Sequence, residues 1–128
     1  MKAPVETAPQ SAAMQAWLEA KPGVTTGQVA GPGGRPPTST MYKVGGKLFA
    51  ILAIRGAPWV IVKSDEHLVE VLKSQYAGVG HRSHLDRRFW ICVQLDADVP
   101  ADEARRLVDA SYDLVRATLT KKQQAALG

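Results

Sequence analysis

The sequence contains a single cysteine, Cys92, and lacks any apolar run that approaches a membrane span in length. One cysteine excludes an intramolecular disulfide and favours a reducing compartment. A membrane helix needs about 20 predominantly apolar residues, and the N-terminus has neither the basic start nor the apolar stretch of a signal peptide. These absences predict a cytoplasmic protein without a membrane segment. Cys92 itself lies in an apolar, strand-like run, which favours a core side chain over a nucleophile.

Positive charge is only slightly in excess, because the chain has 16 Lys and Arg and 12 Asp and Glu, which gives a net charge of +4. This is a mild bias toward anionic partners. A chain of 128 residues fits one domain, and at this size it buries about two thirds of its unfolded surface without metal or disulfide. Residues 1–10 hold two prolines and no apolar period, so we expect a flexible tail followed by a single domain at 11–128.

Two long apolar runs lie back to back in the middle of the chain, Leu48–Ile54 and Pro58–Val62. Their β-branched and aromatic residues and their short connection predict a β-hairpin. Upstream, Met41–Val44 leads into Gly45 and Gly46, where positive φ permits a second tight reversal. Phe89–Leu95 returns to strand character. We therefore expect an antiparallel meander of three strands with a fourth strand in the same sheet.

Amphipathic stripes flank these strands and predict the helices. The first covers Ala12–Ala20, and the second begins with Asp65 and Glu66 and runs to about Ser74. The longest opens at Pro100 and reaches the lysines near residue 121. The expected fold class is α+β, an antiparallel sheet packed against N- and C-terminal helices.

The core and its surroundings follow from the same patterns. Residues 24–39 hold four glycines and three prolines, which indicates a mobile loop. Trp17 lies in an apolar stripe and is expected in the core, whereas Tyr42, beside Lys43, is expected to be the most exposed ring. The strand and helix periods predict a core that includes Phe49, Ile51, Trp59, Ile61, Trp90, Leu107 and Leu114.

Four short strings together resemble the MmcQ/YjbR-like proteins, a bacterial family related in fold to CyaY and the frataxins. They occur in family order at Pro22–Val24, Tyr42–Ala50, His84–Trp90 and Ser111–Val115. The resemblance implies a compact domain with an antiparallel sheet flanked by helices, a double-wing arrangement, and DNA binding. The long Gly/Pro stretch before Thr38 departs from the family pattern. The frataxin kinship also raises iron delivery, which is disfavoured because the first helix carries only Glu19 as an acid.

Basic residues on the strands, turns and the loop before the last strand are the candidates for nucleic-acid contact. If they share one face, they could neutralise phosphates; the alternative is a set of solvated charges that protect sheet edges. The function that we expect is weak, electrostatic DNA binding by a non-enzymatic protein, and the alternative is a protein-binding or small-anion-binding module that uses the same basic loop. The candidate residues are Lys43, Lys47, Arg55, Lys63, Arg82, Arg87 and Arg88.

Metal and catalytic chemistry find little support in the sequence. His81 and His84 could join His67 or Cys92 at a metal, but no Cys-x-x-Cys or His-x-x-x-His pairing accompanies them. Ser111 with His84 and either Asp86 or Asp113 has the residue types of a triad, yet Ser111 falls on an apolar helix stripe without nucleophile-elbow glycines. We therefore expect no metal, no cofactor and no enzymatic activity. Tyr112 is expected to anchor its helix or to send its hydroxyl to a backbone partner.

Overall fold

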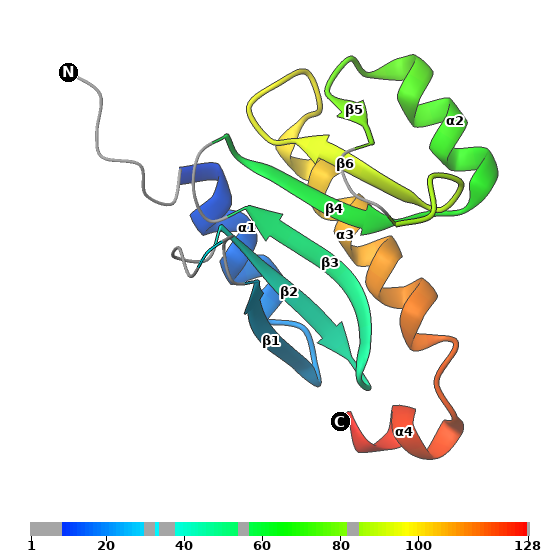
Figure 1. Ribbon diagram of the computed structural model, residues 1–128. Helices are drawn as coiled ribbons and strands as arrows, with labels where there is room; N and C mark the ends of the chain where they lie inside the picture. Colours follow the sequence, from blue (N-terminus) through cyan, green and yellow to red (C-terminus); the bar gives the residue numbers. More distant parts are fainter. Residues whose placement is uncertain (1–8, 30–32, 34–37, 54–56, 82–84, 128) are drawn as a thin grey trace.

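The computed structural model describes residues 9–29, 33, 38–53, 57–81 and 85–127. Within these residues the chain forms four helices and one six-stranded antiparallel sheet (Figure 1). The elements in chain order are α1 (Pro9–Glu19), β1 (Val24–Val29), β2 (Ser39–Val44), β3 (Lys47–Ala53), β4 (Trp59–Lys63), α2 (Glu66–Gln75), β5 (Val79–Gly80), β6 (Trp90–Gln94), α3 (Ala101–Arg116) and α4 (Lys121–Ala126).

The sheet has the strand order β1-β2-β3-β4-β6-β5. This confirms the expected meander, now β2-β3-β4, with β6 as the fourth strand beside β4. Gly45 and Gly46, with φ of 59° and 80°, form the turn between β2 and β3, which is the geometry that a two-residue hairpin turn requires. The α1 helix begins at Pro9, so Pro9 and Gln10 belong to it and not to the expected tail. The rest of that tail lies outside the described residues.

The prediction of a loop throughout residues 24–39 is wrong for its first six residues, which form β1, and for Ser39, which begins β2. Residues 30–32 and 34–37 lie outside the described residues. Strand β1 pairs with β2 over its whole length, from Val24 opposite Val44 to Val29 opposite Ser39. Its sequence contains β-branched Thr25 and Thr26 and a single glycine, which suits an edge strand. Most of the glycines and prolines that suggested a loop come after it.

Strand β5 is too short to leave a periodic signal in the sequence. Its position beside β6 is fixed by a carboxylate that lies about 20 residues further along the chain. Asp98, in the connection between β6 and α3, accepts hydrogen bonds from the backbone N–H groups of Ala77 and Gly78, each at 2.7 Å. These bonds lower the pKa of Asp98, because they favour its charged form. Gln94 then donates its backbone N–H to the Gly78 carbonyl at 2.8 Å, which draws β5 alongside β6.

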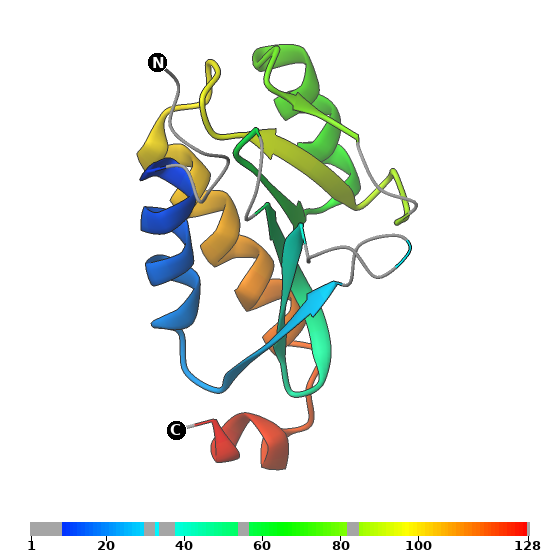
Figure 2. The same ribbon diagram turned by 60° about the vertical axis from the view of Figure 1, so that its left-hand side comes forward.

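Helices α1 and α3 lie side by side on one face of the sheet, which we call the proximal face (Figure 2). Alternate strand residues point to this face, and those from β3, β4 and β6 form one apolar cluster with the helices. The α2 helix lies along the β5 edge, with Asp65 capping its first turn through the Leu68 N–H at 2.9 Å. None of the helices in the described part of the chain has the length and apolar character of a membrane span.

Four of the seven expected core residues are placed differently. Ile51, Trp59 and Trp90 are only half-buried, because they point to the face opposite α1 and α3. Leu114 is 41% exposed, since the buried stripe of α3 follows i, i+3, i+4 spacing through Leu107, Val108, Ser111, Tyr112 and Val115 and Leu114 lies off it. Phe49 and Leu107 are buried in the core as predicted, and Ile61 is buried outside the apolar cluster that the helices share.

The expected single C-terminal helix is two helices. The α3 helix ends at Arg116, where Thr118 donates its hydroxyl to the Val115 carbonyl at 2.6 Å, and α4 begins after Thr120. Thr120 and Gln123 form a capping box, in which the Thr120 side chain accepts the Gln123 N–H and the Gln123 side chain accepts the Thr120 N–H. Leu119, buried between the two helices, packs beneath Gly45. The break between α3 and α4 has a signal in the sequence, which is the Thr120-x-x-Gln123 spacing of the capping box.

Candidate functional site

The face of the sheet opposite α1 and α3, which we call the distal face, carries a continuous apolar row. The strand register places Met41 opposite Ile51, Ile51 opposite Ile61, and Ile61 opposite Cys92. Ile61 and Cys92 are each 4% exposed, yet neither belongs to the apolar cluster that the helices share. Met41 and Ile51 are half-buried. The row is therefore a second apolar group, buried at Ile61 and Cys92 and partly exposed at Met41 and Ile51, on the side of the sheet that faces the viewer in Figure 1.

A second row on the distal face combines charge with an aromatic ring. Lys43 pairs with Leu48, and Lys63 pairs with Trp90, two residues along the strands from the apolar row. Because strands lie about 4.8 Å apart, the Cα atoms of Lys43 and Lys63, with β3 between them, are separated by about 10 Å. Both lysines are half-buried, which is the burial expected when the aliphatic stem of a lysine packs on a surface and its ammonium group stays in water.

The backbone of Lys63 is fixed by a serine from α3. Between the pairs Tyr42–Ala50 and Lys43–Leu48, β3 has one residue more than β2, and this bulge disturbs the pairing of β3 with β4. Ser111 fills the disturbed position: its hydroxyl donates to the Phe49 carbonyl at 2.6 Å and accepts the Lys63 N–H at 2.9 Å. The serine therefore joins three elements and positions Lys63.

The turn before β6 brings two arginines to the same end of the face. Asp86 organises it, because its backbone carbonyl accepts the N–H groups of Phe89 and Trp90 and its carboxylate binds Arg88, with Nη2 of Arg88 at 2.8 Å from Oδ2. Hydrogen bonds from the Arg88 side chain and backbone lower the pKa of Asp86 to about 2. The Ser64 N–H donates to the Phe89 carbonyl at 2.6 Å, so this turn lies next to Lys63.

The predicted basic residues do not all converge. Lys43 and Lys63 share the distal face. Arg87, in the turn before β6, is exposed and forms no ion pair with a described residue. Arg88 is in the same turn, but Asp86 offsets its charge. Lys47 points to the proximal side, where its ammonium donates to the Thr118 hydroxyl at 3.1 Å. The remaining two, Arg55 and Arg82, lie outside the described residues.

The aromatic residues reverse the sequence expectation. Tyr42, expected to be exposed, is 0% exposed, because it alternates with Met41 and Lys43 and points into the proximal core. Burial, together with the charge of Glu19, raises the pKa of Tyr42 to about 12. Trp59 and Trp90, expected in the core, lie half-buried on the distal face. Sequence reasoning missed this face, although the alternation of Val60 and Val62 with Trp59, Ile61 and Lys63 is its signal.

The candidates for metal binding and catalysis take other roles where the structure describes them. The Nε2 atom of His81 lies 3.0 Å from the Leu85 carbonyl oxygen, and His84 is outside the described residues. No group of three potential metal ligands gathers among the described side chains. The Ser111 hydroxyl is committed to backbone groups, and Tyr112 donates its hydroxyl to the Pro22 carbonyl at 2.6 Å as predicted.

The fold and this face define a small α+β protein whose antiparallel sheet is backed by helices on one face and carries a mixed apolar and basic surface on the other. The chain belongs to the YjbR family, since the family model YjbR matches residues 19–114. It is 36% identical to the uncharacterized protein YjbR of Escherichia coli K12 over 75 residues, which are 58% of this chain and 64% of that protein. It therefore covers less than two thirds of that relative.

Further comparisons agree with this assignment. The uncharacterized protein YbdF of Escherichia coli O157:H7 is 28% identical over 89 residues, 69% of this chain and 73% of that protein. The crystal structure of protein DR2400 from Deinococcus radiodurans covers all of this chain and 92% of its own, with a TM-score of 0.79 and 23% identity. A Pseudomonas syringae protein covers 70% of this chain and 86% of its own, with a TM-score of 0.57 and 22% identity. At these identities the structural likeness establishes the fold alone.

Proposed function

We propose that this protein is a non-enzymatic DNA-binding protein that uses the distal face of its sheet. The observation that carries the proposal is the strand register, which puts Lys43 and Lys63 on one face with Trp90 beside Lys63. Arg87 lies three residues before Trp90 in the chain and is exposed. These three cations supply phosphate contacts that position the nucleic acid without reading its sequence.

The affinity expected from so few contacts is weak and salt-dependent. Each phosphate that a lysine or arginine neutralises releases counterions, which contributes a slope of about −0.9 to the dependence of log affinity on log salt. Three contacts give a slope near −2.7 on this basis. The half-buried Trp59 and Trp90 rings add apolar contact area to the same face. A role in binding rather than hydrolysis is supported by Ser111, whose hydroxyl is already bonded to Phe49 and Lys63.

The test is a salt titration of duplex binding with a matched pair of charge variants. Lys43→Gln/Lys63→Gln removes two charges from the distal face, and Lys121→Gln/Lys122→Gln removes two exposed charges from α4, which lies beyond the β2–β3 turn (Figure 1). Affinity of the parent should rise with duplex length. The first variant should flatten the salt slope by roughly two units, and the second should leave it close to that of the parent. Equal slopes for the two variants, or no binding by the parent at low salt, would remove DNA as the partner.

A protein partner on the same face, or a small anion at the same basic loop, is the second candidate. The specific observation in favour of a protein is the partly exposed apolar part of the distal face, Met41, Ile51 and Trp90, because apolar side chains at the centre and charges at the rim are the arrangement of a protein interface. Such a partner would bind with a shallow salt dependence, and Ile51→Asp would abolish binding while Lys43→Gln would weaken it only slightly. A small anion would instead saturate the protein one to one, without any effect of duplex length.

A further inference from the structure

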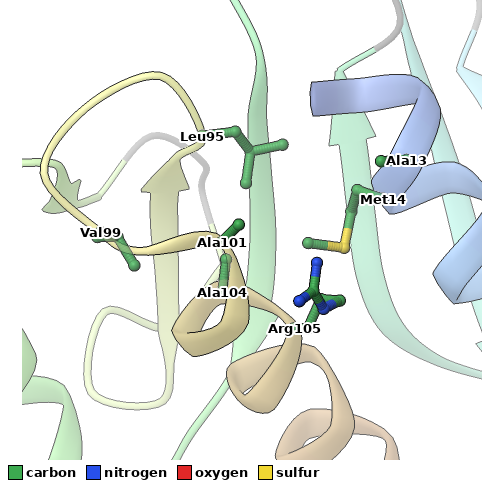
Figure 3. A pocket seen from close by; sticks show the side chains of 7 residues that line it. All are labelled: Ala13, Met14, Leu95, Val99, Ala101, Ala104 and Arg105. Carbon is green, nitrogen blue, oxygen red and sulfur yellow. The ribbon is translucent and has the colours of Figure 1, made fainter. Parts of the chain in front are cut away.

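A pocket opens on the proximal side of the molecule, between α1, the connection from β6 to α3, and the first turns of α3 (Figure 3). Its volume is about 420 Å³, within the range of pockets that bind small molecules. Six of its lining residues are apolar: Ala13, Met14, Leu95, Val99, Ala101 and Ala104. The seventh is Arg105, whose guanidinium group lies beside the Met14 side chain in Figure 3.

Arg105 is held in place but has no acidic partner. Its guanidinium carbon lies 5.5 Å from the centroid of the Trp17 ring, a cation–π contact, and the side chain is half-buried. Trp17 is itself 39% exposed, which corrects its expected place in the core. Among the described residues Arg105 forms no ion pair or hydrogen bond through its side chain.

The carboxylates nearest to Arg105 along α3 are occupied elsewhere. Asp109 accepts the indole N–H of Trp17 at 2.7 Å and pairs with the ammonium of Lys21. Asp102 and Glu103 pair with Arg106, the latter at 2.8 Å. The pocket is therefore an apolar cavity with one positive charge that no described side chain neutralises.

We propose that this pocket binds a small amphipathic carboxylate, with its apolar tail in the cavity and its carboxylate on Arg105. The planar guanidinium group can form two parallel hydrogen bonds with a carboxylate. Its contact with the Trp17 ring already restricts the Arg105 side chain, so less side-chain entropy is lost when the carboxylate binds. Transfer of the tail from water to the surface formed by Met14, Leu95 and Val99 favours binding. This site lies on the side of the sheet opposite the distal face and does not rest on DNA binding.

The probe is sodium octanoate, titrated into the full ¹⁵N-labelled chain and followed by amide chemical shifts. Saturable shifts are expected at Ala13 and Ala104, which line the pocket from two helices. Arg105→Gln should weaken octanoate at least tenfold, because it removes the charge and keeps a planar group over Trp17. Arg106→Gln is the matched control, since its side chain is paired with acids outside the lining, and its affinity should stay within twofold of the parent.

Two further measurements keep the proposal open to refutation if Arg105→Gln does not fold. Octanamide has the same tail without the charge and should bind the parent protein at least tenfold more weakly than octanoate. Ala101→Leu places a larger side chain at the mouth of the pocket, at an exposed first-turn position, and should also abolish the shifts. Linear shifts without saturation, equal binding of octanoate and octanamide, or shifts that depend on protein concentration without any probe would overturn the proposal, the last by assigning the pocket to a second copy of the chain.

Discussion

The two faces of the sheet are made of alternate residues of the same strands, yet they are buried to different extents. On the proximal face Phe49, Val60, Val62 and Val93 are completely buried against the helices. On the distal face Ile51, their counterpart in β3, is half-buried. A strand that is apolar at nearly every position therefore has two apolar faces, and only the helices decide which of them becomes the core. On the other face Met41 and Ile51 stay partly exposed, while Ile61 and Cys92 are each 4% exposed.

The largest difference between the faces should appear when Phe49 and Ile51 of β3 are truncated, which lie on opposite faces because Phe49 is the extra residue of the bulge. Phe49→Ala removes a fully buried ring that packs edge-on against Tyr112, with 5.3 Å between the ring centroids. This change should lower the free energy of unfolding by about 3–5 kcal/mol. Ile51→Ala, on the distal face, should cost about 1–2 kcal/mol because less of its side chain is removed from water. Urea denaturation of both variants measures the difference. Equal losses would mean that both faces are packed alike.

The ionisation of Tyr42 reports how completely the proximal face excludes water. Its hydroxyl is buried without a hydrogen-bond partner in the described part of the chain, so Tyr42→Phe should gain about 1 kcal/mol at neutral pH. The pKa of Tyr42 is raised from 10.0 to about 12, first by burial and then by Glu19. Because the unfolded chain loses this proton first, this ionisation does not change stability below pH 10, and about 2–3 kcal/mol of stability is lost as the pH rises from 10 to 12.

Denaturation of the parent and of Tyr42→Phe at pH 7 and at several values above pH 10 separates this effect from other alkaline titrations. The stability gap between the two proteins should widen as pH rises, in favour of the variant. A gap that stays constant would show that Tyr42 ionises with its ordinary pKa, and hence that its ring reaches water. A variant less stable than the parent at pH 7 would indicate a hydrogen bond to the hydroxyl.

Ser111 connects the two faces, because it stands on the proximal helix and fixes the backbone of a distal lysine. Ser111→Ala leaves the Phe49 carbonyl and the Lys63 N–H without their partner, and the expected loss is about 1–3 kcal/mol. Ser74→Ala is the control, since Ser74 is exposed and bonds only within α2, and should change stability by less than about 0.5 kcal/mol. If Ser111→Ala and Ser74→Ala lower the stability equally, the Phe49 carbonyl and the Lys63 N–H have hydrogen-bond partners other than Ser111.

The sequence predicts the elements of this fold better than their faces. Gly45 and Gly46, the apolar runs of β3 and β4, and the acids before α2 carry strong local signals, so the meander and the helix after it could be placed. Strand β1 could not, because its glycine was counted together with the glycines and prolines that follow it. The length of α3 was overestimated because Thr120 was not recognised as a cap.

The candidate site depends on long-range pairing and was harder to predict. Lys43 and Lys63 are 20 positions apart in sequence, and only the register across β3 shows that they share a face. Tyr42 and Lys43 are adjacent, yet they point to opposite faces, so proximity to a lysine was a poor guide to exposure. Arg105 was not recognised because its role depends on the position of Trp17, which α1 brings to α3 from far along the chain.

A small effect is expected for Trp90, which the sequence alone places in the core. A fully buried tryptophan costs about 3–5 kcal/mol when it is truncated to alanine, but Trp90 is half-buried on the distal face beside Lys63. We therefore expect Trp90→Ala to cost about 1–2 kcal/mol, and Trp90→Phe, which keeps a ring in place, to cost less than Trp90→Ala. Thermal and urea melts of both variants measure this. A loss above 3 kcal/mol for Trp90→Ala would mean that the distal face is as closed as the proximal one, and it would then have no apolar surface to offer to DNA or to a protein.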